Sequence, residues 1–289
     1  MKVKTLSTLL FLVTPLIWAV DPPKGDAKSA PWDGSETVAA YAKRTGWEPV
    51  LTLDVGGGVK WEGVLIPAGS FIMGSPAGEA KTEAESAMEK QHKVTITRPF
   101  YMGKYELTQA QYLRVMGDNP SPNKNDDLPV HNVSWANAQD FCNKLGKLTH
   151  HEVRLPTEAE WEYACRAGTT TPYYNGSQIS DLEKIAWFGG NSEHKLHPCG
   201  QKLPNAWGLY DMLGNIREFV QDWYVAAPLE DGIDPTGPKE GDARNHVVRG
   251  GAYTANAAGA LNCRAATRRG TEALVITGFR IMVATPEAK

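Results

Sequence analysis

The chain has 289 residues, of which 42% are hydrophobic and 22% are charged, a composition typical of a folded globular protein. The formal net charge of −3 argues against a nucleic-acid partner, because phosphate binding needs a basic surface. After residue 20 the sequence holds no apolar run close to the roughly 18 residues of a membrane-spanning helix.

The first 19 residues have the features of a secretory signal peptide. Lys2 and Lys4 form a basic start, residues 9–18 are an apolar run, and Ala19 is a small residue at the expected cleavage point. An uncleaved N-terminal anchor is the alternative, although the apolar run is short for one. We therefore expect a secreted or periplasmic protein with no membrane span after signal cleavage.

Residues 20–60 are predicted to be a linker followed by a short helix and a strand. Residues 21–33 are polar and rich in Pro, whereas residues 36–46 can form a helix and residues 51–55 alternate like a strand. Three glycines follow at 56–58. We interpret them as a hairpin turn, because no Gly-Lys-Ser/Thr follows them as a phosphate loop would require.

Three helices are predicted from their N-terminal capping residues. Thr108 and Gln111 form one capping box, and Thr157 and Glu160 form another. Ser134 is expected to cap a helix between these two. The buried face of that middle helix is predicted to consist of Trp135, Ala138, Phe141, Cys142 and Leu145.

The remaining segments predict strands and irregular backbone. Residues 61–73 read as strand, turn and strand, and residues 75–91 as an acidic exposed loop, with a short helix as the alternative. After residue 168 helical periodicity stops, and short apolar runs such as 247–251 and 278–282 stand among Gly, Asn and aromatic residues. This order predicts an α+β fold and disfavours a parallel doubly wound sheet.

Several sequence strings are specific in combination. They are Ile66–Phe71, Tyr105–Gln109, Val133–Trp135, Arg154–Tyr163, Pro204–Met212, Gly214–Asn215, Arg249–Gly251 and Gly278–Arg280. In this order they closely resemble the formylglycine-generating enzyme family, also called sulfatase-modifying factors. The resemblance covers about residues 61–284. It implies a single α+β domain, low in regular secondary structure and related to the C-type lectin-like scaffold.

Active members of that family convert a cysteine of sulfatases to formylglycine, using O₂ and a copper(I) ion that two cysteines hold. The resemblance places those two cysteines at Ala255 and Ala260. It places the serine after the glycine pair at Ala252, and the first tryptophan of the Asn-x-Trp-Glu-Trp string at Arg217. Copper(I) prefers sulfur ligands, which a methyl group cannot replace. We therefore expect neither copper nor a catalytic residue at these degenerate positions.

The chain has four cysteines, and an even number in an exported chain permits one or two disulfides. The resemblance implies a disulfide from Cys165 to a position that is Ala265 here. Cys263 lies two residues earlier and is expected to take that place, giving a Cys165–Cys263 disulfide. A free buried thiol is the alternative, and a metal or redox role is the least favoured.

The resemblance also implies structural calcium ions. The first site would be formed by Asp211, Gly214, Ile216 and Glu218. Carboxylate and carbonyl oxygens within one tight loop suit Ca²⁺, whereas the alternative is an acidic loop that backbone N–H groups cap. A second site would begin with Asn191 and the carbonyl of Ser192.

Four arginines, Arg154, Arg264, Arg268 and Arg280, are expected to pair internally with carboxylates rather than to bind an anionic ligand. With the oxidase positions altered, we expect a domain that binds a peptide, glycan or protein partner. The binding groove is predicted to be rich in aromatic residues, namely Tyr253, Trp207, Trp187 and Tyr173. An active oxidase acting on sulfatases or other cysteine-bearing peptides is the alternative.

Overall fold

The computed structural model describes residues 30–80, 82–227, 229–241, 245–254, 257–271 and 275–286. The predicted signal peptide, residues 1–19, lies outside these ranges, as does Ala255. None of the helices within the ranges has both the length and the apolar character needed to cross a membrane.

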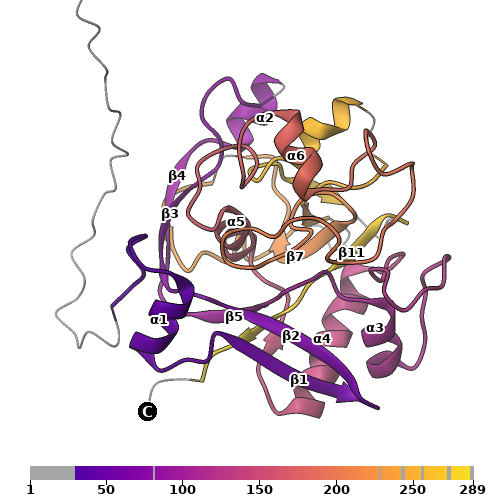
Figure 1. Ribbon diagram of the computed structural model, residues 1–289. Coiled ribbons are helices and arrows are strands. Elements are labelled where there is room, and N and C mark those ends of the chain that lie inside the picture. Colours follow the sequence, from indigo (N-terminus) through magenta and orange to yellow (C-terminus); the bar gives the residue numbers. More distant parts are fainter. Residues whose placement is uncertain are drawn as a thin grey trace, which may run out of the picture.

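Strands in three sheets form the framework (Figure 1). The five-stranded sheet has the order β1 (Val50–Gly56), β2 (Val59–Ile66), β5 (Phe100–Gly103), β12 (Met282–Ala284) and β6 (Val153–Arg154). The four-stranded sheet has the order β10 (Arg269–Thr271), β9 (His246–Arg249), β7 (Arg217–Trp223) and β11 (Thr277–Phe279). The three-stranded sheet has the order β3 (Gly69–Met73), β4 (His92–Ile96) and β8 (Gly232–Ile233).

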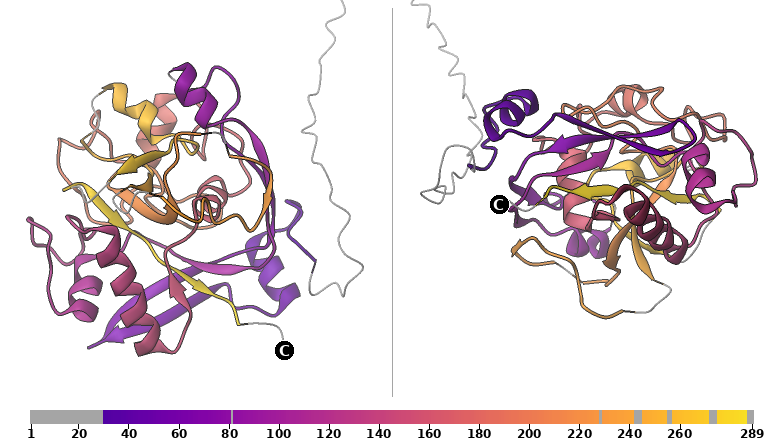
Figure 2. Two further views of the ribbon diagram at one scale, coloured as in Figure 1. Left: turned by 180° about the vertical axis from the view of Figure 1, so that it is seen from behind. Right: turned by 90° about the horizontal axis from the view of Figure 1, so that it is seen from below.

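Short helices lie around and between these sheets. They are α1 (Val38–Thr45), α2 (Glu83–Met88), α3 (Gln109–Met116), α4 (Trp135–Thr149), α5 (Glu158–Arg166), α6 (Ile179–Ile185) and the 3₁₀ helix η2 (Ala257–Cys263). In Figures 1 and 2, α2 and η2 lie at the same end of the molecule, seen from the front and from behind. The mixed α+β single-domain fold predicted from the sequence is confirmed.

The predicted helix starts are confirmed by their hydrogen bonds. In α3 the Thr108 and Gln111 side chains bond to each other's backbone N–H groups, and in α5 Thr157 and Glu160 do the same. Ser134 caps α4, and Asn137 completes a capping box there. These reciprocal bonds satisfy N–H groups that the first turn of a helix leaves without partners.

The core consists of two apolar clusters. One lies between the five-stranded sheet and the helices α3 and α4, where it includes Phe141 and Leu145 from the predicted buried face. The other surrounds α5, from which Tyr163 packs against Phe71 of β3 and against Trp207, while Trp161 contacts Arg249 of β9. Every residue of α5 is buried, so its charged side chains need partners inside the protein.

Two local predictions need correction or refinement. The acidic segment 75–91 contains α2, so the short-helix alternative holds there. The helices α6 and η2 follow residue 168, where no helical periodicity was found. They have seven residues each, which is about two turns and too few to show a clear 3.6-residue period.

Candidate functional site

Glu218 forms a buried ion pair in which both of its carboxylate oxygens accept hydrogen bonds. The Arg280 guanidinium donates to both of its carboxylate oxygens, from Nε and Nη2, each over 2.7 Å. The indole Nε1 of Trp161 donates to the same carboxylate over 2.8 Å. Both side chains of the ion pair are fully buried. A guanidinium therefore occupies the position where a calcium ion was predicted to meet Glu218, and the structure contradicts Glu218 as a calcium ligand.

Asp211 lies beside this ion pair. Its Oδ2 accepts a hydrogen bond from the Gly200 N–H over 2.6 Å, while its buried Oδ1 has no partner among the described residues. Burial raises the pKa of Asp211 to about 6, and the charge of Glu218 contributes to the rise. The Gly200 hydrogen bond and Arg280 act in the opposite direction. Asp211 is thus a buried acid with one carboxylate oxygen that accepts no hydrogen bond from the described residues.

Glu106 is a third buried carboxyl group in this region and was not among the predicted site residues. It accepts hydrogen bonds from Asn215 Nδ2 over 2.6 Å and from the Ile216 N–H over 3.1 Å. Burial raises its pKa well above the ordinary value, and the charges of Asp211 and Glu218 raise it further. The only sequence signal was its place within one of the family strings, because contacts more than 100 residues apart leave no local pattern.

Three carboxyl groups, from Glu106, Asp211 and Glu218, therefore surround one guanidinium. Arg280 balances a single negative charge, so a second acid must hold a proton or face another cation. The described residues contain no group of three or more His, Cys, Asp or Glu side chains arranged to hold a metal ion. The predicted calcium set does not fit as a whole. Calcium at Asp211 stays a prediction, supported by the unpartnered Oδ1.

The second predicted calcium position is a hydrogen-bonded turn. Asn191 Oδ1 accepts from the Phe188 N–H over 2.9 Å, and its Nδ2 donates to the Ala186 carbonyl over 3.0 Å. The Ser192 carbonyl faces Nε2 of His197 at 2.9 Å. The two predicted oxygen donors are thus already engaged within the protein, and the structure favours a turn-capping role for them.

The predicted Cys165–Cys263 disulfide is not formed. Cys165 carries a free thiol, and burial raises its pKa to about 12, which keeps it protonated. Cys263 closes η2, where its sulfur lies so near Gly251 that a Cβ atom there would approach it to 2.6 Å. At the family's partner position, Ala265 instead bonds through its N–H to the Pro172 carbonyl. Cys142 and Cys199 also carry free thiols.

The degenerate oxidase positions lie in and beside the core. Ala252 and Ala260 are buried, Ala260 with 1% of its surface exposed. The hydroxyl of Tyr173 donates to the Ala260 carbonyl over 3.4 Å. Ala255 lies outside the described residues. Arg217, the fourth position, is half-buried at the start of β7. Around Ala260 the space is thus filled by packed side chains.

The predicted aromatic groove does not form as a unit. Trp207 has 6% of its surface exposed and packs edge-on against Trp32 and Tyr163, so it belongs to the core. Tyr173 is buried as well. Trp187 and Tyr253 are half-buried. Two of the four aromatic residues are therefore near the surface, and the other two serve packing.

The predicted internal pairing of the arginines is confirmed. Arg268 donates from Nε and Nη2 to Glu158, and Arg154 donates to both oxygens of Glu160. Arg264 likewise holds both oxygens of Glu89. The pair of Arg280 with Glu218 was described above. Bidentate pairs of this kind satisfy buried charges with a fixed geometry.

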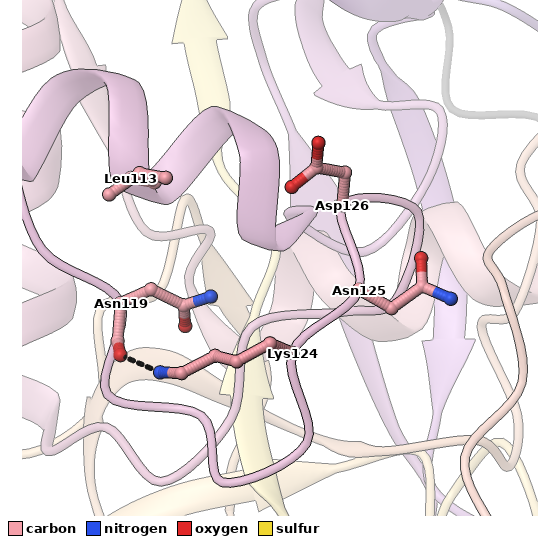
Figure 3. A pocket seen from close by; sticks show the side chains of 5 residues that line it. All are labelled: Leu113, Asn119, Lys124, Asn125 and Asp126. Atoms are coloured by element: carbon pink, nitrogen blue, oxygen red, sulfur yellow. Dashed lines mark hydrogen bonds between the residues drawn. The ribbon is translucent and has the colours of Figure 1, made fainter.

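A widely open surface hollow of about 690 Å³ lies beside α3 (Figure 3). It is lined by Leu113, Asn119, Lys124, Asn125 and Asp126. Inside it the Lys124 ammonium donates to the Asn119 carbonyl. None of the predicted site residues lines this hollow.

The family follows from comparison with known proteins. A sequence model of the sulfatase-modifying factor enzyme 1-like domain matches residues 60–285. This chain belongs to that family. The formylglycine-generating enzyme of Bos taurus is 34% identical over 270 residues, which cover 71% of this chain and 69% of the bovine protein. The chaperone protein LppX of Paenibacillus barcinonensis is 31% identical over 211 residues, which cover 56% of this chain and 71% of LppX.

Solved structures support the same fold. Treponema denticola variable protein 1 superposes with a TM-score of 0.72 at 26% identity, over 82% of this chain and 100% of that one. PvdO from Pseudomonas aeruginosa superposes with a TM-score of 0.68 at 24% identity, over 82% and 99% of the two chains. The range that the family model matches, residues 60–285, almost coincides with residues 61–284, where the family strings occur.

Proposed function

We propose that this chain is an exported member of the family that binds a polypeptide partner and does not carry out the copper-thiolate oxidase reaction. The observation that carries the second part is Ala260, the position of the second copper-binding cysteine. Its methyl group is buried in the core and has no donor atom to offer a metal ion. Residues 1–19, with their basic start and apolar run, support export.

Cys263 does not restore the lost chemistry. A two-sulfur copper(I) site needs a second thiolate within bonding distance. Burial raises the pKa values of Cys142 and Cys165 to about 12, and it raises the pKa of Cys199 well above its ordinary value. A thiol with a pKa of about 12 remains protonated at neutral pH and is a poor metal ligand.

The polypeptide partner is proposed from the kinds of protein found in the family. One relative is named a formylglycine-generating enzyme and another a chaperone protein, so membership alone does not decide the activity. Because the family's copper-binding cysteines align with Ala255 and Ala260, we take the relative named a chaperone protein as the better guide. A chaperone must contact other polypeptides, and we extend that property to this chain. A glycan ligand has no comparable support.

The test is a turnover assay on a Cys-x-Pro-x-Arg peptide with copper(I) and O₂, read by mass spectrometry. We expect no loss of the cysteine sulfur in the wild-type protein, while a formylglycine-generating enzyme serves as the positive control. The double variant Ala255→Cys/Ala260→Cys shows whether the two altered positions are the cause, by its copper(I) binding. Copper-dependent aldehyde formation by the wild type, above a metal-free control, would overturn the proposal.

A further inference from the structure

We propose that the surface around Arg217 and Arg269 binds carboxylates of an acidic polypeptide segment that carries apolar residues between its acids. This inference rests on the proposed function and names the chemistry of the partner. Arg217 begins β7 and Arg269 begins β10, in the same four-stranded sheet. The site is distinct from the buried acidic cluster around Arg280, which has no exposed side chain.

Arg217 differs from every other shielded arginine of the described chain. Those that are buried or half-buried each donate to a carboxylate, namely Arg44, Arg154, Arg166, Arg249, Arg264, Arg268 and Arg280. For the half-buried Arg217 guanidinium, no acceptor or ion-pair partner occurs among the described residues. A guanidinium has five N–H donors, and partial burial removes part of the water that would satisfy them.

The guanidinium of Arg269 places a second positive charge near Arg217. Burial lowers the pKa of Arg217, and the like charge of Arg269 lowers it further, while Cys263 acts in the opposite direction. Two neighbouring cations with too few acceptors are destabilising in the isolated protein. A bound carboxylate would remove the repulsion and satisfy the donors, so the arrangement suits a ligand-binding role better than a structural one.

Arg269 retains donors for such a ligand. Its side chain is 46% exposed, and its Nη2 donates to Asn262 Oδ1 over 2.9 Å. Its contact with Glu85 is long, at 3.5 Å from Nη2. Both contacts use one nitrogen, which leaves Nε and Nη1 to solvent or to a ligand. The chain as a whole has a net charge of −3, so this pair forms a local positive site on an acidic protein.

Two exposed apolar residues, each next in sequence to a residue that bonds one of the arginines, favour a polypeptide ligand. Val275 is 60% exposed, and the next residue, Ile276, accepts the Arg217 N–H at its carbonyl. Leu261 is 40% exposed and precedes Asn262, the partner of Arg269. An acidic segment with apolar residues between its carboxylates matches both features, whereas a sulfated polysaccharide would offer nothing to the Val275 and Leu261 side chains.

The test measures binding of the fluorescein-labelled peptide Gly-Asp-Leu-Glu-Val-Asp-Leu by fluorescence anisotropy, with the neutral peptide Gly-Asn-Leu-Gln-Val-Asn-Leu as its counterpart. We expect the acidic peptide to bind more tightly, and Arg217→Gln and Arg269→Gln each to weaken it roughly tenfold or more. Arg114→Gln, which removes an exposed arginine from α3, should leave the affinity unchanged. Added salt should weaken binding to the wild type.

The melting temperature provides a second readout. Removing Arg217 relieves the desolvation and the repulsion, so Arg217→Gln should melt at the same temperature as the wild type or higher. A lower melting temperature would assign Arg217 a structural role and overturn the inference. Equal affinities for the two peptides, an unaffected Arg217→Gln variant or no binding of the acidic peptide would also overturn it.

The outcomes separate this inference from the proposed function. Binding of both peptides with equal affinity would contradict the carboxylate site and leave a polypeptide-binding protein. Binding of heparin alone, with neither peptide bound, would contradict the polypeptide partner and the inference together. Turnover of the cysteine peptide would contradict the proposed function, whatever the result for Arg217.

Discussion

Replacing Asp211 by Asn should stabilise the protein above neutral pH. Asp211 is a buried acid whose Oδ1 lacks a partner among the described residues, and Glu218 and Glu106 are close by. Asn can still accept the Gly200 N–H with its oxygen. The backbone at this position is left-handed, with φ of 53°, a conformation that Asn tolerates well. The substitution therefore removes a charge without adding backbone strain.

The magnitude follows from the pKa of Asp211, which burial raises from 3.8 to about 6. Because the folded state binds this proton more tightly, the stability that the group contributes is fully present below about pH 4. It is lost as the pH rises through about 6. The difference between the two pKa values corresponds to at most about 3 kcal/mol in the free energy of unfolding. The variant has no such group to ionise, so its stability should exceed that of the wild type by up to this amount.

Urea denaturation near pH 4 and near pH 8, in buffer with chelator, measures the free energy of unfolding of the wild type and of Asp211→Asn. The two proteins should be similar at the lower pH and diverge at the higher one. Asp118→Asn removes an exposed aspartate and serves as the control, for which we expect no divergence. If the Asp211 variant is no more stable than the wild type near pH 8, Asp211 does not carry an uncompensated charge.

Three further predictions concern the same core. Glu162→Gln should cost about 3–5 kcal/mol near neutral pH, because it removes the carboxylate charge that two buried arginines, Arg166 and Arg249, share. Since charged partners lower the pKa of Glu162, the wild type should lose this advantage as the pH falls through that lowered value, which pH-dependent urea denaturation would show. Thr157→Ala should cost about 1 kcal/mol through loss of the α5 cap, whereas Thr157→Ser should cost little. Calcium bound at Asp211 would raise the melting temperature relative to chelator, and Asp211→Ala would abolish the rise; equal melting temperatures in both buffers would exclude the ion.

The sequence by itself determined the local features of this protein. Helix starts were correct at Thr108, Ser134 and Thr157, because a capping box lies within four residues of the chain. The hairpin at 56–58 was correct because its glycines adopt positive φ angles between paired strands. The assignment of Ala260 to a lost copper ligand rests on the family resemblance and stays a prediction.

Only the tertiary structure decided which partners meet across the chain. The strands predicted on either side of the turn near residue 67 are present, but β2 and β3 belong to different sheets. Glu106 reaches Ile216 across 110 residues, and Arg280, rather than a metal ion, faces Glu218. Trp207 looked like a surface aromatic and is buried. Periodicity and capping act within one or two helical turns, whereas the pairing of buried charges depends on how distant elements pack, which leaves no regular spacing in the sequence.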